Sequence, residues 1–454
     1  MAAHIDHSLP TVVVCNISET FYEFLNRAED ANRLIRGEQY RGDRAIIWAG
    51  DPKLVFVSLP IPHAQHVYQQ AGFDHTEYLA PQKPTSWLSL DILREPSLLQ
   101  RLIDYAGEQR IVQLIPYAAT REFLELVETL ERKHGLTVLL PESPTRERLW
   151  IRDYIDSKIG WRILASRWLP NAEELLPEGF ACQTLEGAAD AAHWFSLNGR
   201  SCLVKSDIGE NGIGNLLIRP GDFATQAEIA DYIRRSQFVN DQWLTVEEMI
   251  EAEHPLSPSL EIYVPPTGDP YITYVSDQLF QGFGDFCGVL VSRELLDMSW
   301  YAPLAESGMI LARRLQEMGY VGHFDLDTVV NDEGRVYLLE INPRRTGGTH
   351  VHEFAAYVFG EDYLKSVALL SNDTLSSGSI TDFDELLSVI GDFQYPMQGE
   401  NRGIYLTVTS ALEAHEFGCI IAGADTADLV NIQRDLQARV AECARVNESP
   451  VAGD

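Results

Sequence analysis

Acidic and amide side chains lie in two apolar segments of the sequence where ordinary strand residues are otherwise expected. Asp325 and Asp327 lie in "GHFDLDTVV", and Glu340 and Asn342 lie in "RVYLLEIN". The tetrad "NDEG" at 331–334 joins the two segments and is typical of a tight turn, which predicts a β-hairpin. Carboxylates gathered on one face of a hairpin raise one another's pKa or require a cation. Carboxylate and amide oxygens suit a Mg²⁺ ion that keeps part of its water beside a nucleotide.

The turn also predicts the register of this hairpin. If residues 330 and 335 close the turn, the alternation of side chains in a strand brings all four polar residues to one face. The apolar residues expected on the opposite face are Phe324, Leu326, Tyr337, Leu339 and Ile341. The alternative is that the polar face is the solvated outer surface of an edge hairpin.

The first part of the chain must supply a scaffold, and its pattern predicts a parallel α/β domain over residues 1–147. Short apolar, β-branched segments alternate there with helical patterns, which is typical of a parallel sheet. The expected strands are 11–17, 44–50, 53–60, 110–116 and 136–143. No GxGxxG sequence follows the first strand, so a dinucleotide fingerprint is missing.

The remaining chain predicts two further units, over 148–245 and 246–454. The first contains a helix over 153–170 and a strand over 201–206 that leads into a glycine-rich segment. The second contains the polar hairpin and ends in two strands and an amphipathic helix. The segment "SNDTLSSGSITDFDE" at 371–385 is polar and rich in turn residues, which predicts a linker or a mobile loop.

Composition narrows the function classes. The 454 residues carry a formal net charge of −32. Such a negative field repels nucleic acid and anionic membranes, so we expect neither as a partner; it favours a cationic partner or serves only solubility. The six cysteines form no CxxC pair, which is typical of reduced thiols in a cytoplasmic protein. We find no signal peptide and no apolar run long enough to span a membrane.

The hairpin resembles the C-terminal signature of the ATP-grasp superfamily, whose members hold Mg-ATP between two lobes. The resemblance assigns Asp327, Glu340 and Asn342 to the metal ions, two Mg²⁺ for which Mn²⁺ can substitute. It assigns Arg344 to the transferred phosphoryl group or the substrate, with Arg345 beside it. The implied fold is a pre-ATP-grasp α/β domain followed by two ATP-grasp α+β lobes.

Upstream motifs extend the resemblance over roughly 150–370. "DSK" and "CLVKSDIGENGIGN" are similar to the family's two nucleotide lysines, here Lys158 and Lys205, although Ser206 stands where the family usually has proline. The second motif ends in a glycine-rich lid. The lid glycines implied by the resemblance are Gly209, Gly212 and Gly214. Taken singly, each lysine is better explained by a solvated position, and the glycines are better explained by a plain turn.

The segment "LTVEEMIE" resembles the family's hinge between the lobes. The resemblance implies that Glu247 faces the adenine amine and that Glu248, Met249 and Ile250 line the base. For the ribose we choose Glu253 over Glu251 and Glu261. Asp325 is expected either to handle the incoming amine or to support its neighbours.

Within the superfamily, the long first domain and the "NPRRTGG" ending resemble carboxylate–amine ligases of the pre-ATP-grasp type, such as the peptide ligases of pheganomycin biosynthesis. The implied activity joins an amino-acid-like acid, with its amine blocked, to the N-terminal amine of a peptide through an acyl phosphate and with release of ADP. Peptide-antibiotic biosynthesis and a homodimer are implied with it. The alternatives are an ATP-grasp kinase, another carboxylate–amine ligase or carboxylase acting on a small metabolite, and a nucleotide-binding sensor.

Overall fold

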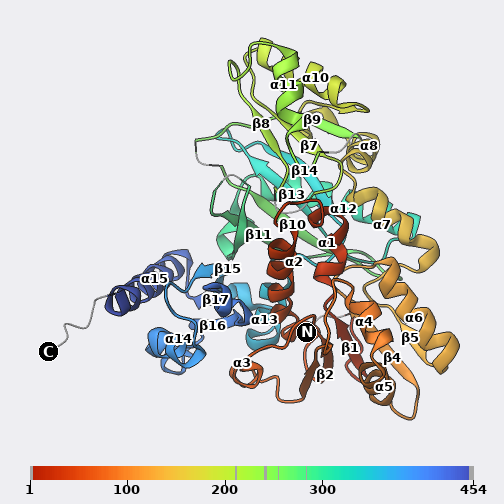
Figure 1. Cartoon of the computed structure of the whole chain (residues 1–454), viewed down its shortest axis with the longest axis vertical. Helices are drawn as coiled ribbons and strands as arrows, with labels where there is room; N and C mark the ends of the chain where they lie inside the picture. Colours follow the sequence, from red (N-terminus) through yellow and green to blue (C-terminus); the bar gives the residue numbers. More distant parts are fainter. Residues whose placement is uncertain (1–3, 210–211, 240–242, 254, 283, 449–454) are drawn as a thin grey trace.

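Three sheets organise the chain (Figure 1). The computed structural model describes residues 4–209, 212–239, 243–253, 255–282 and 284–448. A parallel sheet carries the first part, a small antiparallel sheet forms a separate lobe, and a large antiparallel sheet runs through the rest. The predicted α/β class with two following lobes is confirmed, while the boundaries proposed at 147 and 245 stay predictions.

The first sheet has five parallel strands in the order β3-β2-β1-β4-β5. The strands are β1 (Thr11–Val14), β2 (Lys53–Phe56), β3 (Thr76–Leu79), β4 (Ile111–Pro116) and β5 (Thr137–Leu139). The helices are α1 (Ile17–Leu25), α2 (Ala31–Tyr40), α3 (Ala64–Ala71), α4 (Leu88–Arg94), α5 (Pro96–Tyr105) and α6 (Arg121–His134). β1, β2 and β4 are almost wholly buried, as expected for a parallel sheet covered on both faces.

One predicted strand is wrong. Residues 44–50 form no strand; the 3₁₀ helix η1 (Arg41–Ile46) and a turn occupy them. The segment is apolar because four consecutive residues are buried, although none of them belongs to the sheet. These residues are Ala45, Ile46, Ile47 and Trp48. Short apolar runs do not distinguish these two cases.

The small lobe is a four-stranded antiparallel sheet in the order β6-β9-β7-β8. Its strands are β6 (Gly179–Cys182), β7 (Cys202–Ser206), β8 (Leu216–Ile218) and β9 (Leu244–Glu248), with α10 (Leu185–Leu197) and α11 (Gln226–Arg234) packed together. The helix predicted over 153–170 is two helices, α7 (Leu149–Asp156) and α8 (Lys158–Trp168), followed by α9 (Ala172–Leu175). Ser157 divides them because its hydroxyl caps α8 by accepting from Gly160 N–H.

The large sheet has eight strands in the order β14-β13-β10-β11-β12-β15-β17-β16. They are β10 (Pro258–Val264), β11 (Tyr271–Phe280), β12 (Phe286–Val291), β13 (Gly322–Val330), β14 (Val336–Asn342), β15 (Ala368–Ser376), β16 (Gly403–Val408) and β17 (Glu416–Gly423). The helices of this part are α12 (Tyr301–Met318), α13 (Thr349–Phe359), α14 (Phe383–Ile390) and α15 (Thr426–Glu448). Short 3₁₀ helices complete the chain: η2 (Arg146–Arg148), η3 (Arg293–Asp297), η4 (Tyr363–Lys365), η5 (Gly391–Phe393), η6 (Met397–Gly399) and η7 (Ser410–Ala414).

The linker predicted at 371–385 is wrong in its first half. Residues up to Ser376 belong to β15, which pairs with β12 and β17 inside the large sheet. Ser371, Asn372 and Asp373 are buried. Ser371 accepts from Val289 N–H and Asp373 from Arg44, so two of these polar groups have partners in distant parts of the chain. The tail strands β16 and β17 and the amphipathic helix α15 confirm the pattern predicted for the end of the chain.

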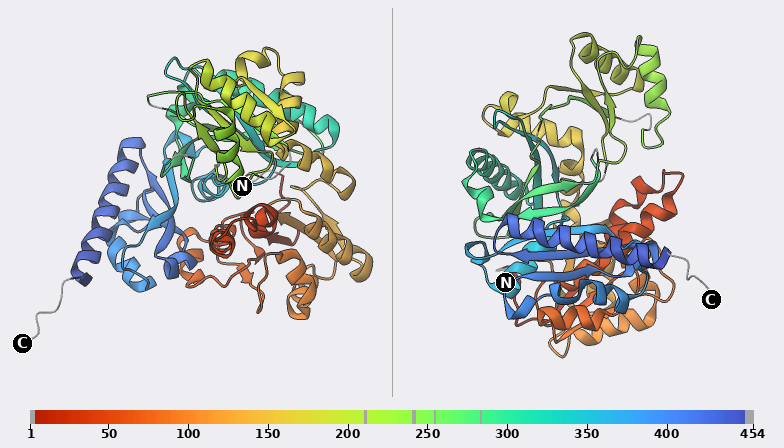
Figure 2. Two further views of the ribbon diagram at one scale, coloured as in Figure 1. Left: turned by 45° about the horizontal axis from the view of Figure 1, so that its top comes forward. Right: turned by 90° about the vertical axis from the view of Figure 1, so that its left-hand side faces the viewer.

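The three parts meet around one central region. Figure 2 shows the small lobe projecting from the rest, and the first domain lying beside the C-terminal strands at one end of the large sheet. A hydrophobic core of buried residues joins Ile46 and Trp48 of the first domain to Phe354 of α13 and Tyr405 of β16. All six cysteines are free thiols, and none of the described helices is long and apolar enough to cross a membrane.

Candidate active site

β13 and β14 form the predicted hairpin, with a register that differs from the expected one. Val330 pairs with Val336, and the pairing then skips Leu339, so that Asp327 faces Glu340 and Asp325 faces Asn342. The skipped residue is a β-bulge, which changes the direction of the side chains beyond it. As a result the four polar residues do share one face, as predicted.

The bulge also explains which apolar residues were assigned incorrectly. Phe324, Leu326 and Ile341 lie in the core as predicted, but Leu338 lies there in place of Leu339. Leu339 and Tyr337 face cavities on the other side. The polar face is not a solvated surface, since Asp325 is only 3% exposed.

The carboxylates on this face are held close to one another. Asn342 donates from Nδ2 to Asp327 Oδ2 at 2.8 Å, and Gln278 of β11 donates to Asp327 Oδ1 at 2.9 Å. Burial and the neighbouring Glu340 raise the pKa of Asp327 to about 7. Burial and the charge of Asp327 raise the pKa of Asp325 well above its usual range. The cluster therefore favours protons or another cation.

Two buried lysines lie on the small-lobe side of this cluster. Lys158, the first residue of α8, places Nζ 2.6 Å from Glu340 Oε2. Lys205 of β7 places Nζ 2.7 Å from Glu247 Oε2, and Arg162 Nη1 lies 3.1 Å from the other oxygen of Glu247. Burial alone would raise the pKa of Glu340, but Lys158 and Lys205 more than offset it, so the pKa is lowered and this carboxylate is ionised.

The glycine-rich segment lies beside Lys158. The helix α8 is fixed there by Asp207, whose side chain accepts from Ser157 and from Ile159 N–H. A Cβ at Gly209 would lie 3.7 Å from Lys158 Nζ. Gly212 has a positive φ of 70°, and a Cβ there would lie 2.5 Å from the carbonyl oxygen of Gly284, so the close approach of these two loops requires glycine. Gly214 also has positive φ, and the residues between Gly209 and Gly212 lie outside the described residues.

The two arginines of the "PRR" sequence lie in different surroundings. Arg344 Nη2 donates to Asn342 Oδ1 at 2.9 Å, and its guanidinium stacks over Phe21 and Tyr117. Arg345 is 1% exposed and donates to both oxygens of Glu142 at 2.7 and 2.8 Å. The catalytic role that the resemblance implies for Arg345 is wrong, because its guanidinium is held by the buried carboxylates of Glu142 and Glu353.

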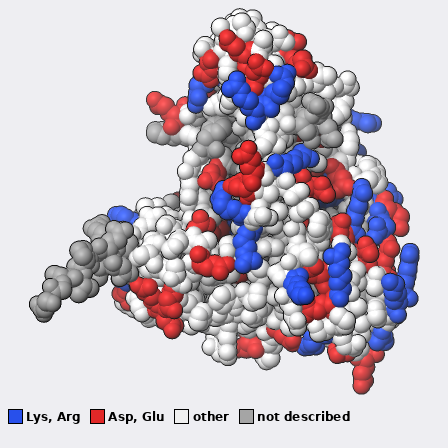
Figure 3. All heavy atoms as spheres, in the orientation of Figure 1, with Lys and Arg blue, Asp and Glu red and all other residues white. Residues whose placement is uncertain are grey.

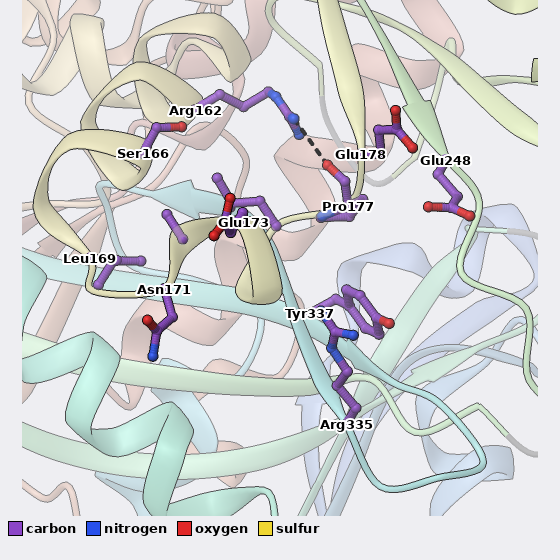
Figure 4. Close-up of a pocket in the computed structure, with 12 residues that line it drawn as sticks. Arg162, Ser166, Leu169, Asn171, Glu173, Pro177, Glu178, Glu248, Arg335 and Tyr337 are labelled. Atoms are coloured by element: carbon purple, nitrogen blue, oxygen red, sulfur yellow. Dashed lines mark hydrogen bonds between the residues drawn. The ribbon is translucent and has the colours of Figure 1, made fainter. Parts of the chain in front are cut away.

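The assignments of the hinge residues stay predictions. Both carboxylate oxygens of Glu247 have cationic partners, one Lys205 and the other Arg162. Glu248 lines a second, open cavity of about 740 Å³ together with Arg162, Glu178 and Tyr337 (Figure 4). Tyr337 precedes Leu339 on the same strand, so this cavity lies farther along β14 from the carboxylates.

The ribose assignment and the remaining hinge residues stay predictions. Glu253 is exposed and donates its backbone N–H to Asp332, while Glu251 accepts from Ser201. Glu261 is fully buried and accepts from His323 and Thr349, which excludes it as a ligand for ribose in this arrangement. Met249 and Ile250 lie just beyond the end of β9, and Met249 donates its backbone N–H to Ser201.

The carboxylates, Lys205 and Arg344 all line one cavity of about 250 Å³. Side chains that sequence reasoning missed line it too, from the first domain and from β15. They are Glu38, Arg41, Arg44, Tyr117 and Asp373. Nothing local in the sequence marks them, because Arg44 and Asp373 meet only through the packing of segments 329 residues apart. Figure 3 shows acidic and basic side chains side by side in the region below the small lobe.

Comparisons with known proteins agree with this arrangement. No protein-family model matches the sequence. Biotin carboxylase of Campylobacter jejuni, solved as a complex with an ATP analogue, superposes with a TM-score of 0.60 at 14% identity, covering 97% of this chain and 96% of that one. N5-carboxyaminoimidazole synthase of Aspergillus clavatus, solved with ADP and its ribonucleotide, has a TM-score of 0.53 at 10% identity, covering 95% and 99%. The chain has the ATP-grasp fold.

In sequence, the chain is 29% identical over 266 residues to L-propargylglycine–L-glutamate ligase of Streptantibioticus cattleyicolor. The match covers 52% of this chain and 54% of the relative, so the chain spans about half the length of that curated relative. The predicted resemblance to the ATP-grasp ligases is thereby confirmed.

The side chains of this cavity are of the kinds that suit Mg²⁺ and a nucleoside triphosphate. The raised pKa of Asp327 and Asp325 indicates a site that is short of positive charge. Oδ1 of Asp325 is buried without a hydrogen-bond partner among the described residues. Asp327, Glu340 and Asn342 would supply oxygen ligands of the kind that Mg²⁺ prefers.

Proposed function

We propose that this protein is an ATP-dependent carboxylate–amine ligase that works through an acyl phosphate and releases ADP. In its finer form, the proposal is that an amino-acid-like acid with a blocked amine is joined to the N-terminal amine of a peptide. The observation that carries it is that Asp327, Glu340 and Asn342 line one cavity with Lys205 and Arg344. The ligase activity of the relative from S. cattleyicolor supports the same reaction class.

A carboxylate is a poor electrophile, and bound Mg-ATP supplies the phosphoryl group that makes it reactive. In the reaction a carboxylate oxygen takes that group as the bond to ADP breaks; the amine nitrogen then bonds to the acyl carbon and inorganic phosphate leaves. Asp327, Glu340 and Asn342 would hold Mg²⁺, proposed as two ions with Mn²⁺ as a substitute. Lys158 and Lys205 would give up part of their present pairing to bind phosphate oxygens.

The two cavities suggest how a nucleotide would lie. We assign its phosphates to the smaller cavity beside Lys205 and Glu340, and its base to the larger one, where Glu248 and Tyr337 form part of the wall. The loop with Gly209, Gly212 and Gly214 would close over the phosphates with backbone N–H groups. Met249, Ile250 and Glu253 complete the assignment for base and ribose as predicted from the sequence.

Arg344 is assigned to the negative charge that develops on the transferred group and on the acyl phosphate. Its planar fork is supported by Asn342 and by the rings of Phe21 and Tyr117, which hold the guanidinium at the cavity wall. Asp325 is assigned to the incoming amine. Its Oδ2 accepts from Ser259, so Oδ1 is the atom that would face the amine.

The test is Mg²⁺-dependent ATP turnover with hydroxylamine as a substitute amine, over amino acids and N-blocked amino acids, with L-propargylglycine and L-glutamate in the panel because the relative's name includes them. ADP and a hydroxamate should form together, depend on the acid, and be lost in Glu340→Gln. AMP as the product would contradict the mechanism. ADP with a phosphorylated product but no hydroxamate would establish a kinase instead, and tight ATP binding without turnover over the whole panel would favour the nucleotide sensor.

A further inference from the structure

The ion pair between Arg44 and Asp373 lies in the wall of the proposed reaction cavity. Arg44 Nη1 donates to Asp373 Oδ2 at 2.7 Å, and the two side chains are 5% and 2% exposed. Arg44 comes from η1 of the first domain and Asp373 from β15, and both line the cavity that contains Glu340 and Arg344. This pair is a charged region of the cavity apart from the residues assigned to Mg²⁺ and the nucleotide and apart from Asp325, which is assigned to the amine.

The second oxygen of Asp373 lacks a donor. Within the described part of the chain, Oδ1 is buried and has no hydrogen-bond partner. His350 Nε2 lies 3.6 Å from this oxygen, too far for a hydrogen bond. Burial lowers the pKa of His350 to about 4, so this ring is neutral and does not balance the carboxylate. A buried carboxylate oxygen without a donor costs free energy unless a ligand supplies one.

Asp43, which precedes Arg44 in the sequence, is a carboxylate with a structural role between the first domain and the C-terminal strands. Its Oδ2 accepts from the backbone N–H groups of Thr409 and Ser410, both at 2.8 Å, and its Oδ1 accepts from the Ser410 hydroxyl at 2.9 Å. Asp43 fastens the first domain to the C-terminal strands with both oxygens occupied, and it does not line the cavity. Asp373 differs on both counts.

We infer that Asp373 and Arg44 form the subsite for the amine substrate of the proposed ligase. Asp373 Oδ1 accepts a hydrogen bond from the α-amino group, and Arg44 donates to the oxygen of the carbonyl or carboxylate next to it. An α-amine and its neighbouring carbonyl lie close together in one molecule, which matches two recognition groups that are themselves in contact. Phe280 and Phe286, which also line the cavity, would contact the substrate's side chain.

The same chemistry occurs in a free α-amino acid and at the N-terminus of a peptide. In the first, Arg44 meets a carboxylate; in the second, it meets the carbonyl of the first peptide bond. This inference rests on the proposed ligase function, because it assigns one of that reaction's two substrates. It extends the function by identifying where the amine binds and which atoms of it are recognised.

The experiment compares steady-state kinetics of Asp373→Asn, Arg44→Lys and the matched control Asp43→Asn. The amines are a panel of amino acids, the corresponding dipeptides, and decarboxylated amines that lack the carbonyl. Asp373→Asn should raise the KM for every amine about 10- to 100-fold, because a charge-assisted hydrogen bond is lost, while the KM values of acid and ATP stay within about twofold. Arg44→Lys should raise the KM about tenfold for amino acids or dipeptides but leave the decarboxylated amines unaffected.

Asp43→Asn should lower the melting temperature without changing any KM, which separates loosening of the interface from loss of the subsite. The inference is overturned if Asp373→Asn changes the KM of the acid in place of the amine, if it changes none, or if Asp43→Asn has the same effect. Arg44→Lys should raise the KM for one of the two classes, amino acids or dipeptides. If it does so for both, the class with the lower KM is the source of the amine.

Isothermal titration calorimetry of the amine panel with the full-length protein keeps the two proposals separable. If no acid in the panel supports ADP formation, that result contradicts the ligase function without testing the amine subsite. Binding of an α-amine that is weakened at least about tenfold by Asp373→Asn would still show the subsite, and binding of no amine, or binding that Asp373→Asn does not weaken, would overturn it.

Discussion

Arg344 and Arg345 are neighbours in the sequence, yet they belong to two ionic regions with opposite designs. Arg344 lies in the wall of the cavity with Asp327, Glu340 and Asn342. Arg345 lies in a buried ionic cluster, which we define as Arg345, Glu142, Glu353, His323, His4 and Glu261. In the cavity, the pKa values of Asp325 and Asp327 are raised. In the buried ionic cluster, each carboxylate lies beside an arginine or a histidine.

The difference distinguishes the cavity, where a ligand could supply missing hydrogen bonds and charge, from the buried ionic cluster, whose charges stabilise the fold. Arg345 donates three hydrogen bonds to two carboxylates, and burial of the Glu142 carboxylate is outweighed by Arg345 and His323, so the pKa of Glu142 is lowered. Both carboxylate oxygens of Glu142, Glu353 and Glu261 already accept a hydrogen bond there. In the cavity, by contrast, Asp325 and Asp373 each keep a buried oxygen without a donor among the described residues.

The largest expected effect is on stability, from Arg345→Met. The substitution leaves Glu142 and Glu353 buried without their cation, so we expect the free energy of unfolding to fall by about 3–5 kcal/mol. Urea denaturation of this variant and of Arg344→Met measures the free energy of unfolding. For Arg344→Met this free energy should stay within about 1 kcal/mol of that of the parent protein. Equal stability of the two variants would remove the distinction between the regions.

Glu340→Gln tests the cavity side. It keeps the shape but removes the charge that pairs with Lys158 and that we assign to Mg²⁺, so we expect turnover to fall about 10²- to 10³-fold with little loss of stability. Acid-dependent ADP formation is the readout. Glu333→Gln, in the exposed turn of the same hairpin, is the control and should retain full activity.

Arg344→Lys should have a smaller effect on the same assay. Lysine keeps the positive charge but not the planar fork, so we expect kcat to fall about 10- to 100-fold while the KM for ATP changes little. A rise in KM alone would mean that Arg344 serves binding and not the charge that develops during transfer.

The smallest expected effect is a pH dependence from the buried ionic cluster. Burial would lower the pKa of His323, but Glu142 and Glu261 raise it to about 9, above the ordinary value of 6.5. Because the folded-state pKa is the higher one, this stabilisation is complete below about pH 6.5 and is lost as the pH rises through 9, by at most about 1.4 kcal/mol per pH unit. His323→Gln should reduce the slope of the free energy of unfolding against pH in this range. An unchanged slope would mean that other groups cause the pH dependence.

Much of the fold and part of the site could be predicted from local patterns. Strand–helix alternation in the first domain, the turn at 331–334 and the common face of Asp325, Asp327, Glu340 and Asn342 depend on neighbours within a few residues, which the sequence states directly. The buried segment at 44–50 and the strand β15 were misassigned because their burial depends on contacts with distant parts of the chain.

Sequence patterns thus indicate which residues could do chemistry and which elements contain them. The pattern does not predict the bulge at Leu339 that aligns Asp327 with Glu340. Only the packing of the folded chain places Arg344 in the cavity wall and Arg345 outside it, and brings Arg44 to Asp373. The physical reason is that periodicity and turn chemistry act between near neighbours, whereas the partner of a buried charge is chosen by the packing of segments that are hundreds of residues apart.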